Sequence, residues 1–114
     1  MSIFSRKNNA YEKQKKIIEA FRIREKRAIW ASATIVSAKQ ESISEAGLSW
    51  RIIRLILRVK PPEGKLYTAS AVWKVEQTQI SLLQPGKEFS IKIDIQDPQV
   101  IFPNMTGAEY IPEY

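Results

Sequence analysis

The first part of the chain repeats its apolar positions with the period of a helix. Gly and Pro are absent between residues 10 and 28, and Asn8 or Asn9 offers an N-cap. On a helical wheel, one mostly apolar stripe of this stretch spans about 120°. Its members are Ala10, Tyr11, Gln14, Ile17, Ile18, Phe21 and Ala28. The pattern predicts an amphipathic helix over residues 10–28, preceded by a flexible basic segment at residues 1–9.

From Ile29 onward the period of the pattern changes to two. The cleanest alternation in the chain lies at residues 89–95. The segment at residues 50–60 puts four apolar side chains on one face, namely Ile53, Leu55, Leu57 and Val59. Turn residues such as Pro62-Glu63-Gly64, Leu82 to Gly86 and Asp97-Pro98 separate the alternating segments. Together these signals predict strands over residues 29–38, 50–60, 67–76, 89–95 and 100–102, with a loop or wide hairpin connection at residues 41–48.

Consecutive strands with turns about every ten residues are typical of a small antiparallel sheet or barrel. We therefore predict an α+β fold that is mainly β. In it, an N-terminal amphipathic helix packs on a small five- or six-stranded antiparallel barrel or curled sheet. One domain is expected over residues 10–104, with its β-module at residues 29–104.

Residues 105–114 are expected to form a C-terminal tail. Pro103 and Pro112 disfavour a regular strand in this part of the chain. Tyr110, Ile111 and Tyr114 therefore either pack on the domain as extended chain or project as a linear motif.

The stretch from Val59 to Pro98 carries several turn motifs in a recognisable order. They are Pro-x-x-Gly at Pro61 and Gly64, Tyr-x-Ala at Tyr67 and Ala69, Leu-x-Pro-Gly at Leu83, Pro85 and Gly86, an alternating strand with Ile91 and Ile93, and Asp-x-x-Asp-Pro at Asp94, Asp97 and Pro98. In this order the stretch resembles a widespread bacterial domain family of unknown function that is often found beside membrane helices. The resemblance implies a small β-module and implies no chemistry.

The charge of the chain is concentrated at its amino-terminal end. The 114 residues carry 18 Lys and Arg against 12 Asp and Glu, a net charge of +6. Nine of the basic and three of the acidic residues lie within residues 1–30, so this first part carries the entire excess. The chain has no apolar run of the roughly twenty residues that a transmembrane helix needs, and no apolar secretion signal at its start. We expect a cytoplasmic protein that can also associate peripherally with the inner face of the membrane.

Enzymatic chemistry has little support in the composition. The absence of Cys and His excludes disulfides, Cys/His zinc sites, catalytic thiols and imidazole bases. Asp94 and Asp97 form the nearest pair of carboxylates, and their position at the end of a strand before Pro98 favours a role in the turn. We predict no enzymatic activity, no catalytic residue, no cofactor and no metal site.

The best candidate for a binding surface is the polar face of the predicted helix. Its cations are Lys15, Lys16, Arg22, Lys26 and Arg27. An acidic protein or an anionic membrane surface would be attracted to them. The alternative is a solvated helix face whose apolar stripe packs on the domain's own core. We predict an accessory or adaptor protein that binds another protein through this face or through a sheet edge, with a membrane surface as a further location. A small immunity or regulatory protein fits the same description.

The runner-up is a small β-barrel that binds single-stranded nucleic acid. The polar face of the predicted strand at residues 50–60 combines Trp50 with Arg54, Arg58 and Lys60. Barrels that bind oligonucleotides combine cations with stacking aromatic rings in this way. The alternative is that the helix covers Trp50, Ile52 and Ile56. We favour this covered arrangement, because a strand with apolar residues on both faces usually has something packed on both.

Overall fold

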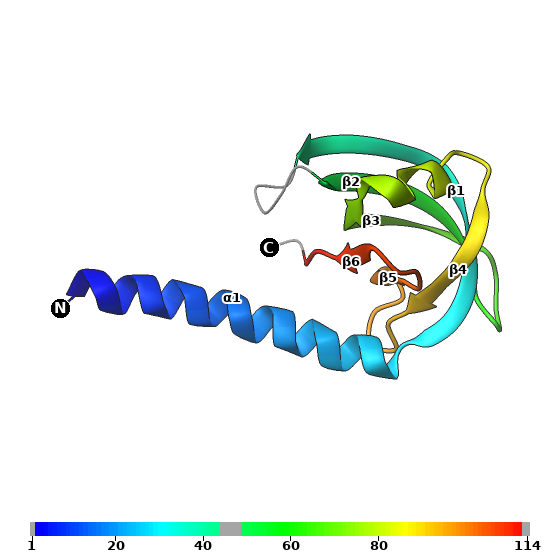
Figure 1. Cartoon of the computed structure of the whole chain (residues 1–114). Coiled ribbons are helices and arrows are strands. Elements are labelled where there is room, and N and C mark those ends of the chain that lie inside the picture. The colour runs from blue at the N-terminus through cyan, green and yellow to red at the C-terminus, as the bar shows by residue number, and fades with distance from the viewer. Residues whose placement is uncertain (1, 44–48, 113–114) are drawn as a thin grey trace.

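One long helix precedes six antiparallel strands (Figure 1). The computed structural model describes residues 2–43 and 49–112, and the side chains of residues 12–41 and 49–112. The elements are α1 (Ser2–Arg27), β1 (Ile29–Ile43), β2 (Trp50–Lys60), β3 (Tyr67–Glu76), the 3₁₀ helix η1 (Gln77–Leu82), β4 (Glu88–Ile93), β5 (Ile101–Pro103) and β6 (Ala108–Tyr110).

The strands form one sheet that curls into a nearly closed barrel. Their order is β5-β4-β1-β2-β3-β6, and every neighbouring pair is antiparallel. The two edge strands of this sheet, β5 and β6, lie close to each other: the rings of Phe102 in β5 and Tyr110 in β6 are 5.0 Å apart. The predicted fold class, α+β and mainly β with five or six antiparallel strands, is confirmed, and the number of strands is six.

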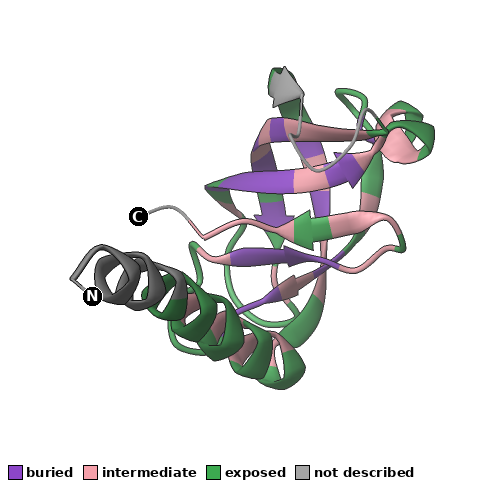
Figure 2. Cartoon of the chain, turned by 60° about the vertical axis from the view of Figure 1, so that its left-hand side comes forward, coloured by how far each residue is buried: buried purple, intermediate pink, exposed green. Residues whose placement is uncertain are grey.

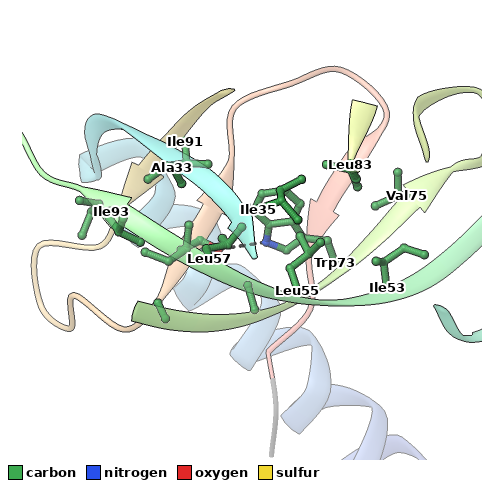
Figure 3. Packing of buried hydrophobic residues seen from close by; sticks show 14 residues of the cluster. Ala33, Ile35, Ile53, Leu55, Leu57, Trp73, Val75, Leu83, Ile91 and Ile93 are labelled. Atoms are coloured by element: carbon green, nitrogen blue, oxygen red, sulfur yellow. Dashed lines mark hydrogen bonds between the residues drawn. The ribbon is translucent and has the colours of Figure 1, made fainter. Parts of the chain in front are cut away.

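The barrel interior is filled by the side chains that the period of two places inward. Ile53, Leu55, Leu57 and Val59 of β2 are all buried, as their alternation predicts. Trp73 of β3 lies at the centre of this core, and its indole Nε1–H donates to the carbonyl oxygen of Ile101 at 3.1 Å (Figure 3). Because a buried indole N–H needs an acceptor, this bond ties β3 to the short strand β5.

Several strand ends differ from the prediction. β5 spans Ile101–Pro103 in place of residues 100–102, and β4 begins one residue earlier than predicted, at Glu88. β1 continues to Ile43, so the connection predicted at residues 41–48 begins later, and residues 44–48 lie outside the described residues. β4 ends at Ile93, two residues before the predicted end. The reason is that the backbone N–H of Asp94 donates to the carbonyl oxygen of Val100 at 3.1 Å, which turns the chain toward β5.

The predicted start of the helix is wrong. α1 begins at Ser2, so residues 2–9, which the sequence suggests are a flexible segment, are helical. Asn8 and Asn9 lie inside the helix and do not cap it. Since no Gly or Pro occurs between Ser2 and Arg27, nothing in this stretch forces the helix to stop.

The C-terminal tail is also part of the barrel. Ala108–Tyr110 forms β6, which pairs with β3 at Trp73–Val75. The two prolines do not interfere, because Pro103 ends β5 and Pro112 follows the last backbone bond, from Ile111 N–H to the Val72 carbonyl at 3.0 Å. Of the two alternatives for the tail, packing against the domain is the correct one for residues 108–112, and Tyr114 lies outside the described residues.

Gly107 allows the tail to turn into β6. Its φ of +81° lies in the left-handed region, and its carbonyl accepts the N–H of Glu76 at 2.8 Å. A Cβ atom at this position would lie 2.9 Å from Cγ of Gln79 and 3.0 Å from Oε2 of Glu76. Both the backbone conformation and the space therefore require glycine.

We expect Gly107→Ala to lower the free energy of unfolding by about 1–3 kcal/mol, measured by urea denaturation. Gly86→Ala is the matched control. Gly86 has a similar φ of +87°, but no atom lies within 4 Å of an added Cβ, so only the backbone cost applies there. Equal losses for the two variants would contradict the steric contribution at Gly107.

Candidate functional site

The helix α1 extends away from the barrel over most of its length (Figure 1). A helix of 26 residues is about 39 Å long, and the Cα atoms of the whole molecule extend over 53 × 32 × 20 Å. Figure 2 shows that the described part of α1 is mostly exposed, whereas the buried residues gather in the strands. The protein therefore consists of a barrel and a projecting helix.

The contacts that the structure describes between α1 and the barrel come from Phe21, Arg24 and Glu25, in the last turns of the helix. The ring of Phe21 lies 5.3 Å from the ring of Tyr110 in β6. Glu25 approaches Lys92 of β4, with Oε1 and Nζ 3.9 Å apart. The guanidinium of Arg24 lies 4.6 Å from the centre of the Phe21 ring and binds Asp94. These contacts anchor the helix to β6, to β4 and to Asp94, the residue that follows β4.

The ion pair between Arg24 and Asp94 is the polar centre of this anchor. Nε and Nη2 of Arg24 both donate to Oδ2 of Asp94, and the carboxylate is buried. The hydrogen bond with Asp94 raises the pKa of Arg24, although burial acts in the opposite direction. Because a buried carboxylate is stable only with a partner of opposite charge, the barrel needs Arg24 at this position.

The turn prediction for the two aspartates is right for one of them. Oδ1 of Asp97 accepts the backbone N–H of Gln99 at 3.0 Å, which is the predicted turn chemistry. Asp94, in contrast, binds the helix. The sequence holds one signal of this role: Arg24 lies on the same side of the wheel as Phe21 and Ala28, and a cation within an apolar stripe needs a buried partner.

The predicted basic face lies on the exposed part of the helix. The structure places Lys15, Lys16, Arg22, Lys26 and Arg27 in exposed positions. Glu12 and Glu19 are exposed as well and fall among these cations on the wheel. Among the residues whose side chains are described, Ile23 is the only large apolar one on this face. The arrangement is therefore a mixed-charge face with a basic excess.

The apolar stripe of the helix is only partly covered by the barrel. Ile17, Phe21 and Ala28 are half-buried, whereas Gln14 and Ile18 are exposed. The side chains of Ala10 and Tyr11 lie outside the described residues. The hypothesis that the stripe packs on the domain's own core thus holds for the last turns of α1 and is wrong at Gln14 and Ile18.

The expectation that the helix covers the polar face of β2 is not met by the described residues of α1. Its described contacts are with β4, β6 and Asp94. Trp50, Ile52 and Ile56 are nevertheless half-buried. At Trp50 the barrel itself provides cover, because Nζ of Lys74 lies 4.9 Å from the centre of its ring.

The four residues that were predicted to bind nucleic acid are spread along the length of β2 and do not form one cluster. Trp50 and Lys60 are the two ends of this strand, roughly 33 Å apart at the usual rise per residue. Arg54 donates its Nε–H to Glu41 of β1, and Arg58 and Lys60 are exposed. A groove that stacks bases needs an aromatic ring with a cation beside it. These four residues do not provide that arrangement.

No described helix combines the length and the hydropathy that crossing a membrane requires. In comparisons with protein-family models, with curated proteins and with solved structures, the chain finds no match.

Proposed function

We propose that this protein is a non-enzymatic accessory or adaptor module that binds an acidic surface of another protein through α1. The observation that carries the proposal is the exposure of the basic face on a helix whose described contacts with the barrel lie at its last turns. Within the described residues, the barrel contributes a rigid support, and α1 contributes a surface that no strand covers.

The composition of the helix face favours a protein over a membrane as the partner. Glu12 and Glu19 lie among the cations, and an anionic bilayer would repel them. A helix that inserts into a bilayer also needs bulky apolar residues on the side that faces the lipid. Among the described residues of this face Ile23 is the only such residue, and Phe21, on the apolar stripe, is turned toward Tyr110. A protein surface that is acidic but also holds some cations complements both signs of charge.

Electrostatic attraction of this kind has a recognisable signature. The cations of α1 are exposed, so the Debye length of about 8 Å at physiological ionic strength limits their reach. Binding is therefore expected to weaken steeply with salt, and to do so mainly through a slower association rate.

Charge reversal of the helix face tests the proposal. We expect the fivefold variant with Lys15, Lys16, Arg22, Lys26 and Arg27 changed to Glu to bind a captured partner about 100-fold more weakly, since each exposed ion pair is worth about 0.2–1 kcal/mol. The dissociation constant is measured by calorimetry with the purified partner.

The barrel offers a matched control with the same net charge. Lys39, Arg58, Lys60, Lys65 and Lys87 are all exposed, and their change to Glu alters the charge of the chain by the same amount. This control is expected to keep its affinity for the partner. Loss of binding in the barrel variant alone would overturn the proposal, as would tight wild-type binding to anionic liposomes or single-stranded DNA in place of a protein.

A further inference from the structure

A groove runs along α1 between the helix and β6. It consists of two adjoining hollows of about 260 and 270 Å³, which share Ile18 and Arg22 of α1 in their walls. The first hollow has Tyr110 of β6 in its opposite wall, and the second continues along the helix to Gln14. Between Gln14 and Glu25 the groove follows about three turns of α1, roughly 16 Å.

The groove contains apolar side chains that are open to solvent. Ile18 keeps 44% of its surface exposed, and Phe21, Ala108 and Pro112 are half-buried. The ring of Phe21 contacts the ring of Tyr110, which fixes the two walls relative to each other. A partner that lies in the groove therefore removes a large apolar side chain from water without having to form the groove first.

The outer rim of the groove carries a row of cations. On the helical wheel, Lys15, Arg22 and Lys26 fall within about 40° of one another, directly beside Ile18. None of the three forms an ion pair with another residue in the described part of the chain. Glu19 lies next to the row and offsets one of its three charges. The rim therefore keeps an excess of positive charge.

The acids on the barrel side of the groove do not cancel this excess. Glu25 and Glu109 are part of the lining there. Oε1 of Glu25 lies 3.9 Å from Nζ of Lys92, and Glu109 lies opposite Lys74 in the pairing of β6 with β3. Because each of these acids has a cation of the barrel beside it, the groove as a whole attracts an anionic partner.

We infer that the groove binds an acidic amphipathic helix of another protein, with its apolar stripe on Ile18 and its carboxylates against Lys15 and Arg22. These two cations are seven residues apart, about 10 Å along the axis, and acids seven residues apart on a partner helix match that spacing on one face. An extended segment covers 10 Å in about three residues, and side chains three residues apart point to opposite faces of a strand. The inference rests on the proposed function, because it names the kind of acidic partner that α1 binds.

A second copy of the chain fits the groove poorly. If two copies of α1 packed antiparallel about a two-fold axis, the same flank of each helix would face the other. The row of Lys15, Arg22 and Lys26 would then lie against its own copy, and like charges oppose such a pairing. The charge pattern thus selects an acidic helix over α1 of another copy.

A synthetic acidic helix tests the inference on the full-length protein. The probe is a peptide of about 18 residues with Leu along one stripe and Glu on both flanks, and the control peptide has Lys in place of every Glu. We expect only the acidic probe to bind, to gain helicity in circular dichroism, and to shift the amides of Ile18, Arg22 and Ala108. Absence of saturable binding, or binding without a gain in helicity, would overturn the inference.

Two double variants with the same change of charge locate the binding surface. The first combines Lys15→Glu and Arg22→Glu on the rim of the groove. The second combines Lys16→Glu and Arg27→Glu, which lie on the far side of the helix. Fluorescence anisotropy of the labelled probe should show about tenfold weaker binding for the first and less than about threefold for the second. Equal losses in the two variants contradict binding in the groove.

The two exposed isoleucines of α1 provide the matching apolar test. Ile18 lies in the groove, whereas Ile23 is 53% exposed on the far side of the helix. Ser has about the same helix propensity as Ile, so both Ile→Ser variants are expected to stay folded. Ile18→Ser should weaken binding of the probe about tenfold and Ile23→Ser should leave it unchanged. The inference is wrong if Ile18→Ser binds the probe as the wild type does.

The captured partner separates this inference from the proposed function. If the fivefold charge-reversed helix loses that partner while Ile18→Ser keeps it, α1 binds the partner outside the groove, and the inference alone fails. If the fivefold variant still binds the partner, the proposed function fails, whatever the synthetic peptide does.

Discussion

Arg24→Met is expected to lower the free energy of unfolding by about 3 kcal/mol, because it leaves the carboxylate of Asp94 buried without a partner. The side chain of Asp94 has no exposed surface, whereas that of Arg24 keeps 22%. We therefore expect a loss at the low end of the range for buried ion pairs. Chemical denaturation of the full chain measures it.

Two further variants isolate the cause of this loss. Arg22→Met is the control on the same helix, and because Arg22 is exposed, its change should stay within about 0.5 kcal/mol of the wild type. Adding Asp94→Asn to Arg24→Met removes the unpaired charge, so the double variant should recover part of the lost stability. If the double variant is as unstable as the sum of the two single variants, the ion pair does not couple helix and barrel.

Trp73→Ala is expected to lower the free energy of unfolding by about 3–5 kcal/mol. The indole is fully buried at the centre of the core, and its ring packs edge-on against Phe89 with centroids 5.8 Å apart. The substitution leaves a cavity and also removes the donor for the carbonyl of Ile101. Thermal and urea unfolding should both report the loss.

Two further variants serve as controls for this prediction: the same change at an exposed tryptophan, and a conservative change at Trp73. Trp30 keeps 70% of its surface exposed, so Trp30→Ala should change the free energy of unfolding by less than about 0.5 kcal/mol. Trp73→Phe keeps most of the volume but leaves the Ile101 carbonyl without its donor, which should cost about 1–3 kcal/mol. A loss in Trp30→Ala as large as that in Trp73→Ala would contradict the assignment of the core.

The sequence predicts those parts of the fold that depend on local period. Alternation identifies Leu55 and Leu57 as core residues because a strand with one buried face must alternate. It also separates the strands from the helix at Ile29, where the period changes. The α+β class follows from these two periods together with the turn residues between the strands.

Features that depend on contacts distant in sequence could not be predicted. β6 exists because Gly107 can adopt a positive φ beside β3, and the prolines around it indicate the opposite. Asp94 resembles a turn residue until the helix supplies Arg24, which lies 70 positions away. The start of α1 was missed for a different reason: Asn8 and Asn9 are good caps, but a good cap does not require a helix to begin there.

The sequence identifies the basic residues of the candidate site, but it does not show how the helix that carries them sits on the barrel. A wheel identifies the cations at Lys15, Lys16 and Arg22 without a structure. Whether the stripe beside them packs on the barrel depends on where the helix leaves it, and only the contacts of Phe21 and Arg24 decide that. The groove beside Ile18 had no signal in the sequence, since its other wall is β6, near the opposite end of the chain.

The most direct test of the account is the footprint of a captured partner on the chain, measured by amide hydrogen exchange of the complex. If α1 is the binding surface, protection on binding should fall on residues 12–27, and the exchange of β1, β2 and β3 should stay as in the free protein. Protection that falls on the outer face of β2, around Arg58 and Lys60, with unchanged exchange in residues 12–27, would contradict it.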